Sequence, residues 1–388
     1  MDHFIQQTPF FTDEQRDLAA SVESFVAREV EPRASLEAET DAQFRGFVDA
    51  LAQAGFLHYA VAYADKPLDV RSLCMVRESL SYSSSLADLA FVMQGLGTYA
   101  ISLAAPEHVR DFWLSRAAQG KAVAAFALTE PDAGSDVAAI KTTAQRERAS
   151  DGSEFYVIEG RKRFISNAGV ADFYTVFART GTKPDGRAEL SAFVVGARMP
   201  GFTVRQRTEM IAPHPIGEIE FDNCRVPAED RVGNEGDGFR LAMQTLDTFR
   251  ASVGAAACGM ARRALDEAIA YSKTRQQFGR PLAQHQMIQA KLADMATELD
   301  AARLLVYRAA YLKDTGAQSV TRAASEAKLF ATESACRIID QALQIHGGVG
   351  LLRGHIIERL YRDVRALRIY EGTSEIQKLI IANQLLKE

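Results

Sequence analysis

The chain has 388 residues, of which 47% are hydrophobic and 24% are charged, as is usual for a soluble globular protein. This length favours two or three packed units over a single hydrophobic core. The formal net charge of −5 provides no basic field, so neither nucleic acid nor an anionic membrane surface is expected as a partner.

The first residues are polar and acidic, unlike a secretory signal or a transit peptide. No uninterrupted apolar run approaches the length of about 18 residues that a membrane span requires. The four cysteines are scattered, with no CxxC pair and no Cys/His cluster, so neither a disulfide framework nor a zinc site is indicated. We therefore expect a cytoplasmic protein, in a reducing compartment, that binds no metal.

The first third of the chain has helical patterning. Thr12, with Gln15 three residues later, predicts a capping box at the start of a helix. Apolar residues then recur at helical spacing at Leu18, Val22, Phe25 and Val26, and again at Phe44, Phe47, Val48 and Leu51. Residues 1–121 are therefore expected to form an N-terminal helical domain.

The pattern changes between residues 122 and 235. Three short segments, 155–158, 173–177 and 191–195, are rich in β-branched and aromatic residues, and turn sequences with Gly or Pro separate them. Connections this short leave no room for helical crossovers, so a middle antiparallel β-domain is expected over 122–235.

From Gly236 the helical spacing returns and persists. Four long amphipathic segments in residues 236–388 indicate a C-terminal four-helix bundle. The predicted fold class is therefore α+β, mainly α, in the order helices, β-domain, helices.

One glycine motif, Gly95-x-Gly97-x-x-Ala100, matches a dinucleotide-binding fingerprint by spacing alone. A Rossmann fingerprint must follow a strand and open a helix in a βαβ unit. This motif lies inside a helical stretch, so a dinucleotide is not expected to bind in the Rossmann manner.

Several segments together resemble the acyl-CoA dehydrogenase family. They are 126–136 (FALTEPDAGSD), 275–282 (RQQFGRPL), 344–350 (QIHGGVG), and 362–365 (RDVR) leading to 369–377 (IYEGTSEIQ). They follow the family's order and spacing, and the resemblance covers essentially the whole chain. It implies the acyl-CoA dehydrogenase fold, one FAD per subunit and a homotetramer.

The resemblance assigns residues of the middle domain to the flavin. It places Thr129 near flavin N5, with Phe126 and Leu128 as its neighbours on the same strand. Ser135 is expected near the pyrophosphate and the CoA chain, where it also contacts substrate. Two further expected contacts are Phe164, against the isoalloxazine, and Ser166, which replaces the commoner threonine and keeps its hydroxyl.

Residues of the C-terminal domain are assigned to the rest of the cofactor. Arg275 and Phe278 match residues that reach the FAD of a neighbouring subunit, the arginine toward its pyrophosphate. The other expected FAD contacts are Gln344, Gly347 and Gly348 on the adenosine side, and Thr373 and Glu375, which close that site. His346 is expected to be structural.

Glu371 matches the family's catalytic base, which takes the α-proton while the β-hydrogen leaves as hydride to FAD. A carboxylate is a weak base at its ordinary pKa, so a largely apolar pocket is expected to raise that pKa. The backbone N–H of this residue and a ribityl hydroxyl of FAD are expected to polarise the thioester carbonyl. The flanking Tyr370 and Gly372 are predicted substrate contacts.

Some members place the base on the helix that corresponds to residues 246–254, but this segment contains no Glu. Two residues on it, Asp247 and Arg250, match positions that contact the CoA pantetheine and shape the site. The alternative interpretation of these two residues is an i,i+3 ion pair on the surface.

The implied reaction is dehydrogenation of an acyl-CoA to the trans-2-enoyl-CoA in fatty acid or carboxylic acid catabolism, with electrons passed to electron-transferring flavoprotein.

An acyl-CoA oxidase remains an alternative, and a DNA-protective flavoprotein is disfavoured by the acidic charge and by Glu371. A nitroalkane-oxidase-like activity is disfavoured because the base of those members is Asp, where this chain has Glu371. A decarboxylating, glutaryl-type activity is disfavoured because such members bind the distal carboxylate with an Arg in the substrate-pocket helix. Residues 78–109 contain no Lys or Arg. Met93 lies on the helix that is expected to form the floor of the acyl pocket, where its side chain would shorten the pocket. This favours short, branched or cyclic acyl groups.

Overall fold

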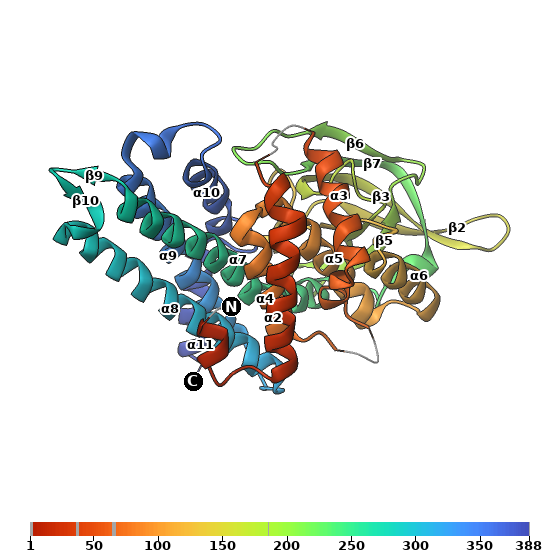
Figure 1. Cartoon of the computed structure of the whole chain (residues 1–388). Coiled ribbons are helices and arrows are strands. Elements are labelled where there is room, and N and C mark those ends of the chain that lie inside the picture. Colours follow the sequence, from red (N-terminus) through yellow and green to blue (C-terminus); the bar gives the residue numbers. More distant parts are fainter. Residues whose placement is uncertain (1–2, 36–38, 64–66, 185, 388) are drawn as a thin grey trace. The chain divides into compact units, whose positions relative to one another are not determined.

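The computed structural model describes residues 3–35, 39–63, 67–184 and 186–387 (Figure 1). The chain forms two compact units. The first comprises Met1–Glu37, Asp69–Asp88 and Asp247–Glu388, and the second comprises Ala38–Leu68 and Leu89–Leu246.

The first unit is helical. Its elements are α1 (His3–Gln7), α2 (Asp13–Phe25), α4 (Val70–Ser83), most of α7 (Gly238–Thr274), α8 (Gln286–Asp314), α9 (Thr321–His346), α10 (Ile356–Val364), α11 (Ser374–Leu385) and the short strands β9 (Gln276–Gln277) and β10 (Arg280–Pro281). The predicted capping box is confirmed at the start of α2, where the side chains of Thr12 and Gln15 each accept from the other's backbone N–H.

The core of this unit lies among α4, α7, α8, α9 and α10 and is rich in alanine. Helices α8 and α9 pack side by side (Figure 1). At Gly254 of α7, an added Cβ would lie 2.7 Å from Val306 Cγ2 and 3.3 Å from Ala331 Cβ. The missing side chain therefore lets α7 approach both α8 and α9 closely.

The second unit contains an eight-stranded sheet. Its strands are β1 (Ala124–Ala127), β2 (Thr143–Arg148), β3 (Glu154–Ser166), β4 (Phe173–Thr182), β5 (Ala188–Gly196), β6 (Phe202–Arg207), β7 (Ile216–Pro227) and β8 (Arg231–Val232). They follow the order β6-β7-β3-β2-β4-β5-β8, with β1 beside β4. The predicted strand segments lie within β3, β4 and β5, and most pairings are antiparallel.

Two pairings are parallel, β1 with β4 and one residue pair between β2 and β4. The β2–β3 hairpin intervenes in the chain between β1 and β4, so the chain re-enters the sheet in its original direction without a helical crossover. Helices α3 (Thr40–Gln53) and α6 (Glu107–Ala118) also belong to this unit.

Helix α5 (Ser85–Ala104) contains the Gly95–Ala100 motif in its interior, as predicted. It is the one helix in the described ranges that is long and apolar enough to cross a membrane, and 83% of that stretch is buried within the protein. Its Gln94 is fully buried, donates to the carbonyls of Ala117 and Ala122, and accepts from Ala124 N. These bonds tie α5 to the start of β1, so the amide of Gln94 is structural.

Candidate active site

Glu371 lies in a strained turn between a short 3-10 helix (Arg365–Arg368) and α11. It has φ 53°, a left-handed conformation that residues with a Cβ rarely adopt, and Gly372 follows with φ 92°. Strain of this kind persists only when the surroundings impose it, and it is common at functional sites. The backbone of this turn therefore marks Glu371 independently of its sequence motif.

Side chains on both sides fix the ends of the turn. Glu333 of α9 accepts from Arg368 Nε at 2.8 Å and from Ser374 Oγ at 2.6 Å. Thr373 is the N-cap of α11, since its hydroxyl accepts from the Ile376 N–H. The Thr373 side chain, a predicted FAD contact, thus also has a structural partner in its own helix.

Two buried donors hold the middle of the turn. Gln377 Nε2 donates to the carbonyls of Glu371 at 3.2 Å and Gly372 at 2.9 Å. Lys328 Nζ donates to the same Gly372 carbonyl at 2.8 Å. Neither residue is among the predicted site residues, because Lys328 belongs to no recognised motif and the role of Gln377, the last residue of the 369–377 segment, is visible only in this contact.

The Glu371 carboxyl group is poorly solvated. Its Oε2 is shielded from solvent and has no hydrogen-bond partner in the described part of the protein. Burial raises the pKa of Glu371 above its usual 4.5, while the cations Arg77, Lys328 and Arg250 oppose that rise. An unpartnered carboxylate with a raised pKa is what proton abstraction near neutral pH requires.

Arg77 is a buried cation near Glu371 and is not among the predicted site residues. Its guanidinium is buried and donates to Asp88 through Nε at 2.8 Å and Nη2 at 2.7 Å, and to Ser252 Oγ at 2.9 Å. Tyr370 and Glu371 both lie within its electrostatic field. Arg77 directly precedes residues 78–109, which contain no Lys or Arg, and its guanidinium bonds Asp88 and Ser252.

Asp247 and Arg250 form the ion pair expected from their i,i+3 spacing. The pair is not on the surface, however, because Arg250 is buried and its Nε has no partner among the described residues. Thr321 Oγ1 donates to the other carboxylate oxygen of Asp247 at 2.8 Å. Both residues belong to the same unit as Glu371 and the predicted substrate contacts Tyr370 and Gly372, whereas the predicted contact Ser135 belongs to the second unit.

In the second unit, β1 ends at Ala127, so Leu128 and Thr129 lie just beyond the strand and not on it with Phe126 as predicted. A buried ion pair supports this segment. Lys162 Nζ donates to Glu130 Oε1 at 2.8 Å and to the Leu128 carbonyl at 3.2 Å. The Glu130 carboxylate also accepts from the backbone N–H groups of residues 141 and 142. Phe126 and Thr129 are half-buried, Leu128 is buried, and Ser135 is exposed on the loop that follows.

The end of β3 has the features of a ligand-binding edge. Phe164 has φ 55° and leaves 49% of its surface exposed. Ser166 Oγ lies 2.9 Å from Nε2 of His214, and burial lowers the pKa of that histidine to about 4, so the imidazole is neutral. Asn167 Oδ1 is buried without a partner in the described ranges. A half-exposed aromatic ring beside hydroxyl and amide groups fits a flavin ring.

The β9–β10 hairpin carries Arg275 and Phe278. Phe278 occupies the tight turn with φ 53° and is 94% exposed, and Arg275 is exposed as well. At the C-terminal end of α9, Gln344, Gly347 and Gly348 are exposed, as is Glu375 in the first turn of α11. His346 is buried, stacks on Tyr271 and hydrogen bonds the Ala342 carbonyl, a structural role.

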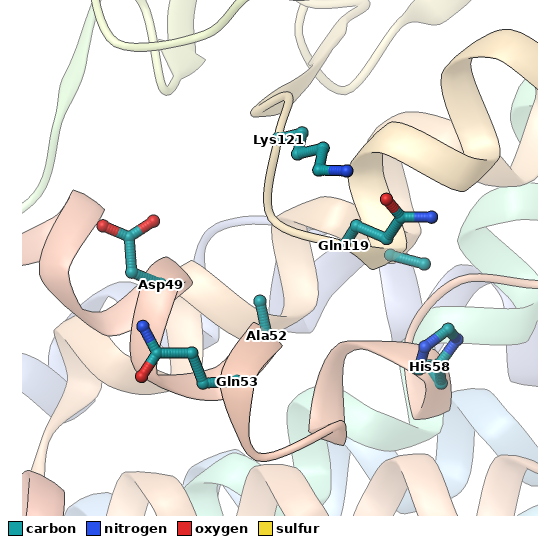
Figure 2. A pocket seen from close by; sticks show the side chains of 7 residues that line it. Asp49, Ala52, Gln53, His58, Gln119 and Lys121 are labelled. Carbon is teal, nitrogen blue, oxygen red and sulfur yellow. The ribbon is translucent and has the colours of Figure 1, made fainter.

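A cavity of about 330 Å³ lies elsewhere in the second unit (Figure 2). Asp49, Gln53, His58, Gln119 and Lys121 line it. None of the predicted site residues is among the residues that line it, so this cavity is distinct from the candidate active site. Among the described residues, no group of three His, Cys, Asp or Glu side chains is arranged to hold a metal ion.

Family models match nearly the whole chain. The N-terminal domain of acyl-CoA dehydrogenase matches residues 12–121, the middle domain matches 125–224, and the C-terminal domain matches 236–386.

Individual proteins are similar over the same length. The 3-(aryl)acrylate reductase of Clostridium sporogenes is 39% identical over 97% of this chain and 100% of its own length. Butyryl-CoA dehydrogenase from Megasphaera elsdenii has a TM-score of 0.88 and 33% identity, covering 97% of this chain and 99% of that chain. A chain from the structural study of the electron transferring flavoprotein of Acidaminococcus fermentans has a TM-score of 0.88 and 34% identity, covering 97% and 99%.

These matches confirm the fold that the sequence motifs predicted, with helical, β and helical segments in that order. The chain belongs to the acyl-CoA dehydrogenase family of oxidoreductases.

Proposed function

We propose that this protein dehydrogenates an acyl-CoA thioester to the trans-2-enoyl-CoA, with Glu371 as the base that takes the α-proton. The observation that carries the proposal is the Glu371 carboxyl, which is raised in pKa by burial and has an oxygen without a hydrogen-bond partner. Such a group is free to accept a proton from a bound substrate. Asp247 and Arg250 are proposed to contact the CoA portion.

The proposed cofactor is FAD. When bound, it supplies the acceptor for the β-hydride, a chemistry that no amino-acid side chain provides. Thr129 and Ser166 offer hydroxyls for its polar edge, and Phe164 offers an exposed ring for its face. Gln344, Gly347 and Gly348 are proposed for its adenosine side, as the family resemblance implies.

The proposed electron acceptor is electron-transferring flavoprotein, in keeping with the similarity to a chain from a study of such a protein. All four cysteines are free thiols, which supports the proposal of a reducing, cytoplasmic compartment.

The purified protein is expected to be yellow, and to bleach anaerobically when one member of an acyl-CoA panel is added. A protein that takes up no FAD on reconstitution would refute the proposed function. Stoichiometric hydrogen peroxide in air, with no other acceptor, would instead identify an acyl-CoA oxidase.

The similarity to a 3-(aryl)acrylate reductase favours a second candidate function, in which the site works in the reducing direction. The raised pKa of Glu371 makes its protonated form accessible, and that form would return a proton to Cα of an unsaturated substrate, while reduced FAD, when bound, would supply the hydride at Cβ. Assays with a reduced dye and an enoyl-CoA or aryl acrylate, beside the oxidative panel, separate the two directions.

Arg275→Ala tests the proposed homotetramer with shared FAD sites. Phe278 is 94% exposed, and the exposed Arg275 lies close to it in the chain, so both are accessible to a neighbouring subunit. A charge-assisted contact to a pyrophosphate contributes roughly 1.5–3 kcal/mol, so FAD affinity is expected to fall about 10-fold to 150-fold. FAD and assembly are linked, so the variant should also dissociate more readily on dilution.

Sedimentation of wild type and variant, with and without excess FAD, measures both effects. Lys273→Ala, an exposed cation near the end of α7, is the matched control and should behave as wild type. Equal FAD content and equal association in Arg275→Ala and wild type would show that Arg275 does not contact the cofactor.

A further inference from the structure

Lys328 is a fully buried lysine in the first half of α9. A buried ammonium group is unfavourable unless it has partners, and lysine is almost never fully buried without them. Its Nζ donates to the Gly372 carbonyl at 2.8 Å. Glu371 is the acidic group that acts on it most strongly, ahead of Glu333 and Glu375. The partners of this cation are therefore the turn that follows Glu371 and Glu371 itself.

Gln377 approaches the same turn from α11. It is fully buried, and its Nε2 donates to the carbonyls of both Glu371 and Gly372. A Cβ on Gly372 would lie 2.5 Å from this nitrogen, so the amide is packed directly against the turn. A left-handed residue with a Cβ is strained, and these hydrogen bonds offset that strain.

We propose that Lys328 and Gln377 are positioning residues for Glu371. Gln377 holds the backbone conformation that aims the carboxylate at the substrate, and Lys328 both holds that backbone and supplies a positive charge that keeps the buried carboxylate ionised. This inference rests on the proposed function, because it assigns a task to Glu371 as the base.

The charged groups around Glu371 come from four other elements: Arg77 of α4, Asp88 of α5, Arg250 of α7 and Lys328 of α9. Arg77 is paired with Asp88, and Arg250 with Asp247. Arg250 also opposes the charge on Lys328, and burial lowers the pKa of this lysine to about 8. Lys328 is therefore charged at pH values below about 8.

The two tasks predict different pH profiles. Glu371 is active when ionised, so activity is lost as pH falls through its pKa. Lys328→Met removes a cation that lowers this pKa, so the acid limb of kcat/KM should move up by about one pH unit. Lys328→Gln should move it as well, because it keeps a donor but no charge. Lys328→Arg should keep the limb near its wild-type position.

Gln377→Leu removes the amide without changing any charge, so kcat should fall about 10-fold to 100-fold from lost alignment. The acid limb of this variant should stay in place. Lys291→Met is the matched control, since Lys291 of α8 bonds Gln341 of α9 in the same bundle. It should leave both kcat and the acid limb at the wild-type values.

The experiment is a series of pH profiles of the FAD-loaded enzymes, using the acyl-CoA that wild type turns over fastest. Thermal unfolding of each variant identifies any that do not fold. The Lys328→Gln profile tests the role of Lys328, and the Gln377→Leu profile separately tests the role of Gln377. An acid limb unmoved in Lys328→Gln, or wild-type kcat in Gln377→Leu, would overturn the corresponding assignment. If wild type turns over no acyl-CoA, the proposed function fails instead.

Discussion

Replacing Glu371 by glutamine is expected to lower turnover of acyl-CoA by at least about 100-fold, since a positioned base contributes that much or more. The substitution preserves the size of the side chain and removes only its ability to take a proton. The backbone contacts of Gln377 and Lys328 go to carbonyls of the turn, which the substitution does not alter. FAD content and acyl-CoA affinity should therefore remain close to those of wild type.

Stopped-flow reduction of the flavin by acyl-CoA measures the step directly, and spectral titration measures binding. Wild type should show an acid limb above pH 4.5, because burial raises the pKa of Glu371. This limb should disappear in the residual rate of Glu371→Gln, which has no carboxyl to titrate. Asp340→Asn, which removes an exposed acid of α9 that has no predicted role in the site, is the control. More than half of wild-type activity in Glu371→Gln would show that another group is the base.

The second large expected effect is on stability. Arg77→Met should lower the free energy of unfolding by about 3–5 kcal/mol, the usual result of leaving one partner of a buried ion pair uncompensated. The partner is Asp88, and both side chains are almost fully buried. Chemical denaturation at neutral pH, followed by circular dichroism, measures this change in the free energy of unfolding.

Two further variants test the cause. The double variant Arg77→Met/Asp88→Leu removes both charges, so it should regain much of the lost stability. Lys141→Met breaks a pair with Asp132 in which both side chains are largely exposed. The free energy of unfolding of Lys141→Met should therefore lie within about 1 kcal/mol of the wild-type value. If Arg77→Met also lowered the free energy of unfolding by no more than about 1 kcal/mol, Asp88 would not behave as an uncompensated buried charge.

The sequence by itself determined the order of the segments and the candidate base. Apolar spacing distinguished helix from strand because each structure buries one face at its own period. The capping box at Thr12 is local, so it was also predictable. Glu371 was found through its motif, and its assignment as the base stays a prediction.

The contacts that tune the site were decided only by the tertiary structure. Lys328 lies 44 residues from Gly372, Ser166 lies 48 from His214, and Lys162 lies 32 from Glu130. No periodicity links residues so far apart, because their proximity depends on how helices and strands pack. The raised pKa of Glu371 has the same origin: desolvation depends on the atoms that surround the carboxyl, and the strained turn exists because buried side chains from α9 and α11 hold it.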